Sequence, residues 1–264
     1  MDRPIGVFDS GVGGLTVLRE LVRTLPGERY VYLGDTARVP YGAKSAETVT
    51  RYSIEIANCL ITRFDIKMLV VACNTASSLS LPVLRKIYKI PVVGMVDPCV
   101  QKAASLPRNG SIGVIGTAGT IRSGAYEQAL HAALPSARVV CRPCPLLVSL
   151  AEEGWGSHPV ARAVVAEYLG PFREEPPDAL ILGCTHYPVL KDTIRQFLGE
   201  GVVLIDSGEE AAHVVDILLS EGDARREAGR GELSFLVTDD PGIFARVGEP
   251  FFGAALSRVD RVTL

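Results

Sequence analysis

The chain repeats one pattern twice, and this repeat constrains its fold more than any other feature of the sequence. Residues 5–11 (IGVFDSG) are similar to residues 112–118 (IGVIGTA), and residues 69–75 (LVVACNT) are similar to residues 180–186 (LILGCTH). The cysteine of the second motif follows the start of the first motif by 68 residues in one copy and by 72 in the other. Two copies at matched spacing predict two similar units that face each other across a cleft.

Each copy alternates short apolar runs with helical patterns, which is typical of an α/β fold with parallel sheets. Strands are predicted at residues 5–8, 30–33, 68–72, 92–93, 112–115, 139–140, 180–182, 202–205 and 234–237. Apolar residues recur at helical spacing between these runs, as at Leu15, Leu18 and Val22. We therefore expect two α/β domains with parallel-type sheets, related by pseudo-twofold symmetry, with the active site in the cleft between them.

The repeat also predicts the domain boundaries. The first domain is expected to comprise residues 1–97 and 208–264 and to carry Cys73, and the second to comprise residues 98–207 and to carry Cys184. The return of the last segment to the first domain is inferred from the strand-like run Ser234 to Val237, which has no counterpart in the repeat.

Charge and hydropathy exclude several classes of protein. The 264 residues include 27 Lys and Arg and 30 Asp and Glu, which gives a net charge of −3. This charge does not indicate a protein that binds nucleic acid. No apolar run reaches the ~18 residues that a membrane span needs. Residues 1–4 lead directly into the first predicted strand, so no signal peptide is expected. A cytoplasmic globular protein without nucleic-acid or membrane partners is predicted.

Cys73 and Cys184 are the strongest candidates for chemistry among the six cysteines. Each follows a buried strand and opens a helical stretch, and ligands of open α/β sheets bind outside the carboxyl ends of the strands. A helix amino terminus lowers the pKa of a thiol from its usual ~8.5, which favours a thiolate near neutral pH. Two thiols that approach one carbon from opposite sides suit a base on one face and an acid on the other. This arrangement predicts racemisation or epimerisation.

The residues beside these cysteines fit an amino-acid substrate. Hydroxyl, amide and backbone donors for carboxylates are predicted at Ser10, Asn74, Thr75, Thr117, Thr120 and Thr185. Asp9 is a candidate acceptor for an ammonium group or a partner for a thiol, and His186 is a candidate proton relay for Cys184.

The remaining motifs favour structural roles. Cys59 lies on the apolar face of a predicted helix, and Cys99 lies in a predicted linker with no evident partner. Cys141 and Cys144 form a C-x-x-C pair, but a zinc site needs a second pair and the flanking prolines weaken a redox role. Residues 11–14 (GVGG) lack the spacing of a dinucleotide-binding loop. Structural or surface positions are predicted for His131, His158 and His213. No metal or cofactor is expected.

The motifs as a set resemble the glutamate racemase family over essentially the whole chain. The similar segments are residues 7–15 (VFDSGVGGL), 34–42 (GDTARVPYG), 72–77 (ACNTAS), 144–146 (CPL), 152–154 (EEG), 183–188 (GCTHYP) and 238–241 (TDDP). The resemblance implies a cofactor-independent interconversion of L- and D-glutamate that supplies D-glutamate for peptidoglycan. It implies that Cys73 removes the α-proton of D-glutamate with help from Asp9, and that Cys184 removes that of L-glutamate with help from His186 and Glu152.

The resemblance also implies the substrate contacts and the assembly. The contacts implied are Asp9, Ser10, Pro40, Tyr41, Gly42, Asn74, Thr75, Thr185 and His186. A homodimer is the expected assembly, and the role of Asp35, which belongs to one of the similar motifs, is left open between structure and function.

Two alternatives remain from the sequence. Aspartate and hydantoin racemases share the paired-cysteine plan, and the residues do not indicate the length of the substrate side chain. A two-domain cleft is also typical of small-molecule binding proteins, although matched thiols and the predicted lack of a signal peptide argue against that class.

Overall fold

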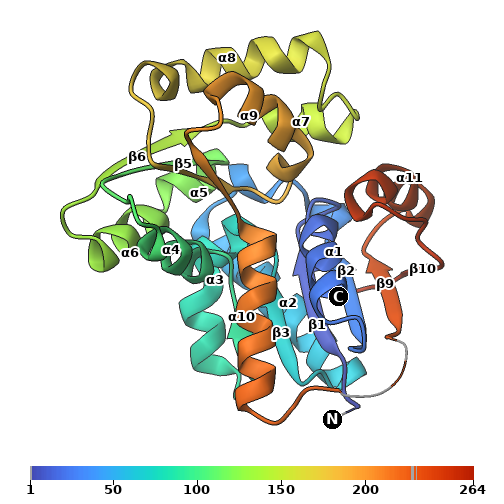
Figure 1. Ribbon diagram of the computed structural model, residues 1–264. Helices are drawn as coiled ribbons and strands as arrows, with labels where there is room; N and C mark the ends of the chain where they lie inside the picture. Colours follow the sequence, from blue (N-terminus) through green and yellow to red (C-terminus); the bar gives the residue numbers. More distant parts are fainter. Residues whose placement is uncertain (1, 227–228, 230) are drawn as a thin grey trace.

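Two parallel sheets form the centre of the molecule (Figure 1). The computed structural model describes residues 2–226, 229 and 231–264, and within these residues a six-stranded sheet has the order β10-β9-β2-β1-β3-β4 and a four-stranded sheet the order β6-β5-β7-β8. The strands are β1 (Ile5–Asp9), β2 (Tyr30–Gly34), β3 (Met68–Val71), β4 (Val92–Val93), β5 (Ser111–Gly116), β6 (Arg138–Pro143), β7 (Ala179–Gly183), β8 (Val203–Asp206), β9 (Leu233–Val237) and β10 (Val259–Arg261).

The repeat in the sequence corresponds to a repeat in topology. The order β2-β1-β3-β4 in the larger sheet matches the order β6-β5-β7-β8 in the smaller one, with β1 and β5 in the same relative position. The predicted α/β architecture with two parallel sheets is therefore confirmed. The run Ser234 to Val237 belongs to β9, which pairs with β2 and so lies in the larger sheet.

Helices cover both faces of the sheets. They are α1 (Leu15–Thr24), α2 (Ala46–Phe64), α3 (Asn74–Ile87), α4 (Val96–Ser105), α5 (Ala118–Arg122), α6 (Ala125–Ala133), α7 (Leu146–Glu152), α8 (Pro159–Glu174), α9 (Lys191–Leu198), α10 (Ser207–Glu221) and α11 (Pro241–Phe252), with 3₁₀ turns η1 (Thr36–Arg38), η2 (Tyr41–Ala43) and η3 (Tyr187–Leu190). Among these described helices, none is long and apolar enough to cross a membrane.

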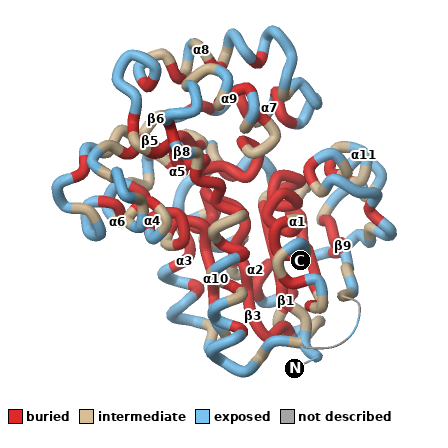
Figure 2. The backbone as a smooth tube through the Cα atoms, in the orientation of Figure 1, coloured by how far each residue is buried: buried red, intermediate tan, exposed pale blue. Residues whose placement is uncertain are grey.

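The side chains of each central strand alternate between the two faces of its sheet, and both faces are buried. Ile5 and Val7 of β1 pack in one core cluster with Leu18 of α1, whereas Phe8 packs in another with Leu60 of α2. Successive side chains of a strand point to opposite faces, so a strand that is apolar throughout needs cover on both sides. Figure 2 shows these strands as the buried interior of the molecule.

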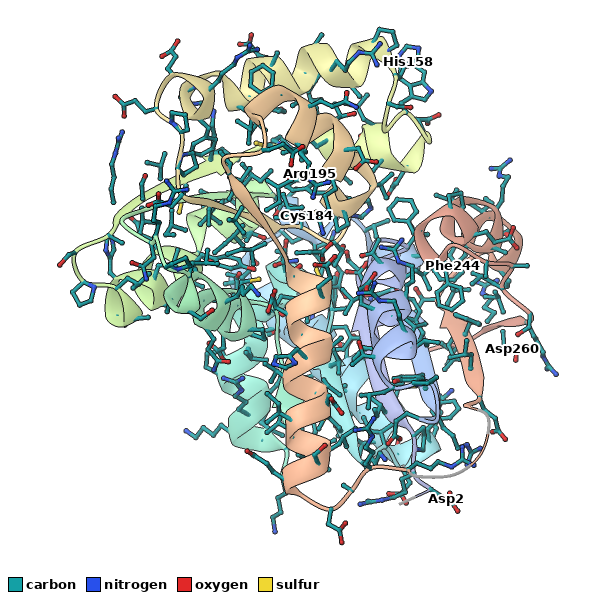
Figure 3. The ribbon with its side chains drawn as sticks, viewed as in Figure 1. Asp2, His158, Cys184, Arg195, Phe244 and Asp260 are labelled. Atoms are coloured by element: carbon teal, nitrogen blue, oxygen red, sulfur yellow. The ribbon has the colours of Figure 1, made fainter. Side chains whose placement is uncertain are left out.

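We call the part of the chain that forms the six-stranded sheet (β1–β4, β9 and β10) the larger sheet unit, and the part that forms the four-stranded sheet (β5–β8) the smaller sheet unit. Helix α10 joins these two sheet units. It follows β8 of the smaller sheet and packs against α1 and α4, and in Figure 1 it runs from the smaller sheet along the larger one. The order of the sheets and this path bring the carboxyl ends of β1, β3, β5 and β7 toward a common region, where Figure 3 labels Cys184.

The prediction of a linker around Cys99 is wrong. Asp97, Pro98 and Cys99 lie in the first turn of α4, and Cys99 is buried. Proline is tolerated there because the first N–H groups of a helix have no partner within the helix. Asp97 adds a favourable negative charge to that end.

Candidate active site

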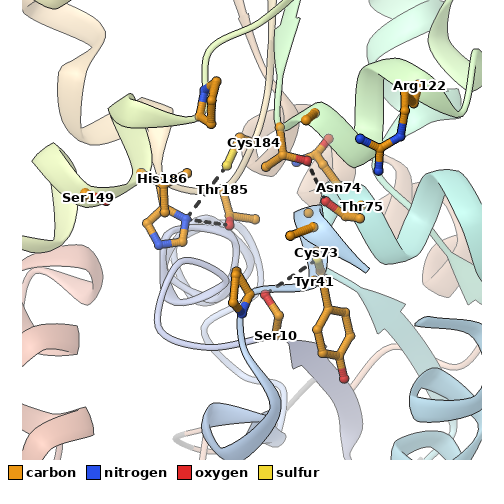
Figure 4. Close-up of a pocket in the computed structure, with 17 residues that line it drawn as sticks. Ser10, Tyr41, Cys73, Asn74, Thr75, Arg122, Ser149, Cys184, Thr185 and His186 are labelled. Atoms are coloured by element: carbon orange, nitrogen blue, oxygen red, sulfur yellow. Dashed lines mark hydrogen bonds between the residues drawn. The ribbon is translucent and has the colours of Figure 1, made fainter. Parts of the chain in front are cut away.

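A cavity of about 450 Å³ lies where the carboxyl ends of the two sheets meet (Figure 4). Its volume is within the range of small-molecule sites. The lining residues are Ser10, Pro40, Tyr41, Gly42, Ala43, Cys73, Asn74, Thr75, Thr117, Ala118, Arg122, Pro145, Val148, Ser149, Cys184, Thr185 and His186. Both candidate thiols line this cavity, and Figure 4 shows them on different walls.

Cys73 caps α3. Its Sγ accepts a hydrogen bond from the backbone N–H of Ala76 at 3.5 Å and donates to Ser10 Oγ at 3.8 Å. Burial, together with the negative charge of Asp9, nevertheless raises the pKa of the Cys73 thiol to about 12. The prediction that the helix terminus makes this thiol acidic is therefore wrong, because desolvation of the thiolate and the charge of Asp9 outweigh the hydrogen bond from the Ala76 N–H.

Cys184 has a different backbone environment, and Pro188 is the reason. An α-helix that started at Cys184 would need an N–H at position 188 to bond the Cys184 carbonyl, but proline has none. The Tyr187 N–H bonds that carbonyl instead, at 3.1 Å, and the chain forms the turn η3. At the equivalent place in the first copy, Ser77 N–H bonds the Cys73 carbonyl at 2.8 Å and α3 begins directly.

His186 connects Cys184 to Glu152. Nδ1 lies 3.8 Å from Cys184 Sγ, and Nε2 lies 2.8 Å from Oε1 of Glu152. Burial alone would lower the pKa of His186, but the hydrogen bonds to Cys184 and Glu152 and the charges of Cys184 and Asp9 raise it to about 10. His186 is therefore an imidazolium near neutral pH, with one N–H directed at the sulfur and one at the carboxylate.

Asp9 lies behind the cavity wall rather than on it. It is 1% exposed, and Oδ2 accepts from the backbone N–H of Gly11 at 2.9 Å. Within the described part of the chain, Oδ1 has no hydrogen-bond partner. Burial raises the pKa of Asp9, and the charge of His186 opposes this shift. Asp9 thus offers a vacant acceptor oxygen close to the site.

Three threonine hydroxyls meet at one part of the cavity. Thr75 Oγ1 lies 2.9 Å from Thr117 Oγ1 and 3.1 Å from Thr120 Oγ1, and the last two are 3.0 Å apart. Thr75 comes from the unit with the larger sheet and the other two from the unit with the smaller sheet. Because each hydroxyl can donate or accept, the cluster can turn its protons toward a bound carboxylate.

A buried carboxylate organises the loop that contributes Pro40, Tyr41 and Gly42. Asp35 is fully buried and accepts hydrogen bonds from Arg38, from Thr238 Oγ1 at 2.9 Å and from the Tyr41 hydroxyl. Arg38 is bound in turn by Glu55 of α2. The motif residue whose role the sequence left open is thus the centre of the hydrogen bonds that shape this loop.

Most of the predicted site residues come together, and a few lie one layer back. Asp9, Thr120 and Glu152 are absent from the lining, although Thr120 and Glu152 bond residues that belong to it. Sequence reasoning missed Ala43, Ala118, Arg122, Pro145, Val148 and Ser149. A signal existed for those after β6, because its end at Pro143 is in register with Gly116 of β5 and so shares the same sheet edge.

The other cysteines and histidines are not among the residues that line the cavity. Cys59 is part of the core, as predicted. Cys141 and Cys144 are free thiols on and just after β6. Across residues 2–226, 229 and 231–264, no group of three or more Cys, His, Asp or Glu is arranged to hold a metal ion. Exposed positions are occupied by His131, His158 and His213.

Known proteins match this chain along its full length. The sequence model of the Asp/Glu/Hydantoin racemase family matches residues 5–215. A glutamate racemase of Geobacter metallireducens is 52% identical over 263 residues, which cover 99% of this chain and 97% of the relative.

Solved structures agree with the sequence matches. Glutamate racemase isoform RacE1 from Bacillus anthracis is 39% identical with a TM-score of 0.95, and covers 99% of this chain and 98% of its own. Glutamate racemase from Francisella tularensis, solved in complex with D-glutamate, is also 39% identical, with a TM-score of 0.93 and coverage of 99% and 98%. With two thiols lining one cavity and matches of this extent, the chain is an enzyme that belongs to the Asp/Glu/Hydantoin racemase family.

Proposed function

We propose that this enzyme interconverts L- and D-glutamate by proton transfer between Cα and two thiols, without a cofactor. The observation that carries the proposal is that Cys73 and Cys184, which follow corresponding strands of two matching sheets, line one cavity from different walls. The choice of glutamate rests on the relatives, which are named glutamate racemases at up to 52% identity.

The proposed reaction balances one proton lost against one gained. One cysteine, as thiolate, removes the proton from Cα, and the electron pair of the C–H bond remains on Cα as a carbanion. The opposite cysteine, as thiol, donates its proton to the other face of that carbon. The product has the inverted configuration, and the two sulfurs have exchanged protonation states.

The electrostatics of the site make Cys73 the proton donor of the first step. The Cys73 thiol stays protonated at neutral pH because burial and Asp9 raise its pKa to about 12. On the other wall, the His186 imidazolium directs an N–H toward Cys184. We infer that Cys73 acts as the acid in the first proton transfer, and we assign the role of base to Cys184 because it lies beside the His186 imidazolium. With the roles implied by the family, this assignment corresponds to L-glutamate as the substrate.

In the reverse direction Cys73 must act as the base, as a thiolate. A positive charge near Cys73 would stabilise that thiolate. The ammonium group of the bound amino acid supplies that charge, and the buried Asp9 carboxylate behind the cavity wall is proposed to stabilise the ammonium through its negative charge. Asp9 therefore assists Cys73, whereas His186, held by Glu152, assists Cys184. The two carboxylates of glutamate are proposed to bind Ser10, Asn74, Thr75, Thr117 and Thr185, the backbone of Pro40, Tyr41 and Gly42, and through the hydroxyl cluster Thr120.

Circular dichroism with each enantiomer of glutamate and aspartate tests the substrate. We expect racemisation of both glutamate enantiomers and little or none of aspartate. Preference for aspartate, or binding of glutamate without turnover, would overturn the proposal.

An isotope experiment tests the two-thiol step. In D₂O, with L-glutamate as substrate, the D-glutamate formed early should be deuterated at Cα while the remaining L-glutamate keeps protium. The same should hold with the enantiomers exchanged, because each product receives its proton from a thiol that has exchanged with solvent. Early product that retains the substrate's protium would indicate a single base.

We further propose the setting in which the enzyme acts. D-Glutamate for peptidoglycan, a cytoplasmic location and a homodimer are supported by the resemblance to glutamate racemases. Two domains, residues 1–97 with 208–264 and residues 98–207, are supported by the separate sheets. Restored growth of a bacterium that requires D-glutamate, and sedimentation of the purified enzyme as a dimer, are the expected results.

A further inference from the structure

Asn74 lines the cavity, and a residue outside the cavity holds its amide. Tyr126 belongs to α6, in the unit with the smaller sheet, and its hydroxyl lies 2.6 Å from Oδ1 of Asn74 in the first turn of α3. On the other side of the amide, Nδ2 of Asn74 donates to Ser207 Oγ at 3.2 Å. Ser207 is the first residue of α10, which joins the two units.

The contacts of the Tyr126 hydroxyl indicate that it donates a hydrogen bond to Asn74 Oδ1. Besides Asn74 Oδ1, the nearest acceptors are the Met95 carbonyl at 3.4 Å and Cys99 Sγ at 3.8 Å. A tyrosine hydroxyl has one proton, and the shortest contact takes it. Burial raises the pKa of Tyr126 well above its ordinary value, so the hydroxyl remains protonated and donates.

This donor decides which end of the Asn74 amide faces the substrate. An asparagine side chain has a donor end and an acceptor end of nearly equal size, and rotation by half a turn exchanges them. With Oδ1 bound by Tyr126, the –NH₂ group keeps one N–H for Ser207 and a second for the cavity. The reversed amide would place its –NH₂ group against the Tyr126 hydroxyl and its carbonyl against Ser207 Oγ and the cavity.

We propose that Tyr126 is a positioning residue that locks the Asn74 amide with its N–H toward the cavity, so that Asn74 can only donate to a substrate carboxylate. This inference rests on the proposed function, since glutamate carries two carboxylates and no other anionic group. It also gives the two sheet units a shared part in the site, because the residue that binds and the residue that orients it come from different units.

The hydroxyl can be removed without disturbing the packing. The Tyr126 ring supports Gly183, where a Cβ would lie 3.3 Å from Cε2 of the ring, and Gly183 precedes Cys184. Tyr126→Phe keeps this ring. Tyr30→Phe is the matched control, because Tyr30 is equally buried and its hydroxyl also bonds acceptors, the carbonyls of Leu21 and Leu25 at 3.0 Å, at a site away from the cavity.

The test is steady-state racemisation by Tyr126→Phe, Asn74→Ala and the double variant, with wild type and Tyr30→Phe in the same assay. We expect Tyr126→Phe to raise KM for both glutamate enantiomers about tenfold, corresponding to ~1.4 kcal/mol, and Tyr30→Phe to leave KM unchanged. In the Asn74→Ala background, Tyr126→Phe should add less than a twofold effect, because its only route to the substrate is already gone.

The outcomes separate this inference from the proposed function. If wild type does not racemise glutamate, the proposed function fails. If wild type is active but Tyr126→Phe has the wild-type KM, or retains its full effect beside Asn74→Ala, the positioning role is wrong and the proposed function stands. A rise in KM of the same size in Tyr30→Phe would also overturn it, because the effect would then follow from lost stability.

Discussion

At the scale of single residues, the site contains two thiols in unlike settings. Cys73 caps a helix beside a buried carboxylate, whereas Cys184 lies beside an imidazolium at the start of a 3₁₀ turn. The two thiols therefore have different neighbours, a carboxylate beside Cys73 and a protonated histidine beside Cys184.

Replacement of either thiol removes one of the two proton-transfer groups. We expect Cys73→Ala and Cys184→Ala each to lower kcat by ~10²–10⁴-fold while the far-ultraviolet circular dichroism stays unchanged. Cys59→Ala is the matched control, since Cys59 is a buried thiol in the core, and its activity should stay within about twofold of wild type. Near wild-type turnover by either site variant, measured on the folded protein, would contradict the two-thiol mechanism.

His186 sets the pH dependence. Its pKa is raised to about 10, so its proton is present below that pH and is lost as the pH rises through it. We expect kcat/KM to fall on the alkaline side, with an apparent pKa near 10, as His186 loses this proton. His186→Asn, which cannot titrate, should remove that limb, whereas the titration of the substrate ammonium is common to both enzymes.

The same variant has a second signature. The equilibrium constant of a racemisation is one, so kcat/KM must stay equal for the two enantiomers in any variant. We expect kcat and KM of His186→Asn to change unequally for L- and D-glutamate, because only Cys184 loses its partner. Equal changes of kcat in both directions would leave His186 without a preference for Cys184.

At the scale of elements, the segment between β2 and α2 is shaped by one buried carboxylate. Asp35 is bound by side chains from its own loop and, through Thr238, from the segment after β9. These hydrogen bonds connect the backbone that lines the cavity at Pro40, Tyr41 and Gly42 to α2, through Arg38, and to the segment after β9.

Neutralisation of Asp35 should affect both stability and binding. We expect Asp35→Asn to lower the free energy of unfolding by ~1.5–3 kcal/mol, because Arg38 keeps only Glu55 as a charged acceptor, and to raise KM for glutamate more than it lowers kcat. Urea unfolding and steady-state kinetics measure the two effects. Asp65→Asn, at an exposed ion pair with Arg3, is the control and should change neither by much. A stable variant with wild-type KM would show that the loop holds its shape without this charge.

At the scale of the whole molecule, the two sheet units touch at a point that only glycine allows. A Cβ on Gly13 would lie 2.3 Å from Thr185 Oγ1 and 2.5 Å from His186 Nδ1. Three residues further along the chain, Thr16 Oγ1 donates to the Thr185 carbonyl at 2.8 Å. The start of α1 therefore packs directly on the residues that follow Cys184.

A methyl group added at Gly13 should push the two sheet units apart at this contact. We expect Gly13→Ala to cost ~1–3 kcal/mol of stability through overpacking and to lower kcat/KM at least tenfold, because His186 and Thr185 must move. Gly170→Ala is the control: nothing lies within 4 Å of its added Cβ, and the position is inside α8. It should keep full activity, because Gly170 lies outside the cavity lining. Wild-type activity of folded Gly13→Ala would contradict this prediction, because it would mean that the contact adapts to the methyl group without displacing Thr185 and His186.

The architecture and the position of the two thiols could be predicted from the pattern of residues along the chain. Strands that are apolar throughout, such as residues 68–72, and a motif that recurs at matched spacing are local properties of the chain, so they could be recognised before any contact was known. Parallel sheets then bring the residues that follow β3 and β7 to strand ends, which is why Cys73 and Cys184 could be paired in advance.

Only the tertiary structure decided how those residues behave. The pKa of Cys73 depends on burial and on Asp9, and that of His186 on Glu152, which lies 34 residues away in sequence. The partner of Cys99 and the orientation of Asn74 likewise come from Tyr126, which follows them by 27 and 52 residues in sequence. Desolvation and hydrogen bonding act through distance in space, and a pattern along the chain carries no record of that distance until the two units are packed together.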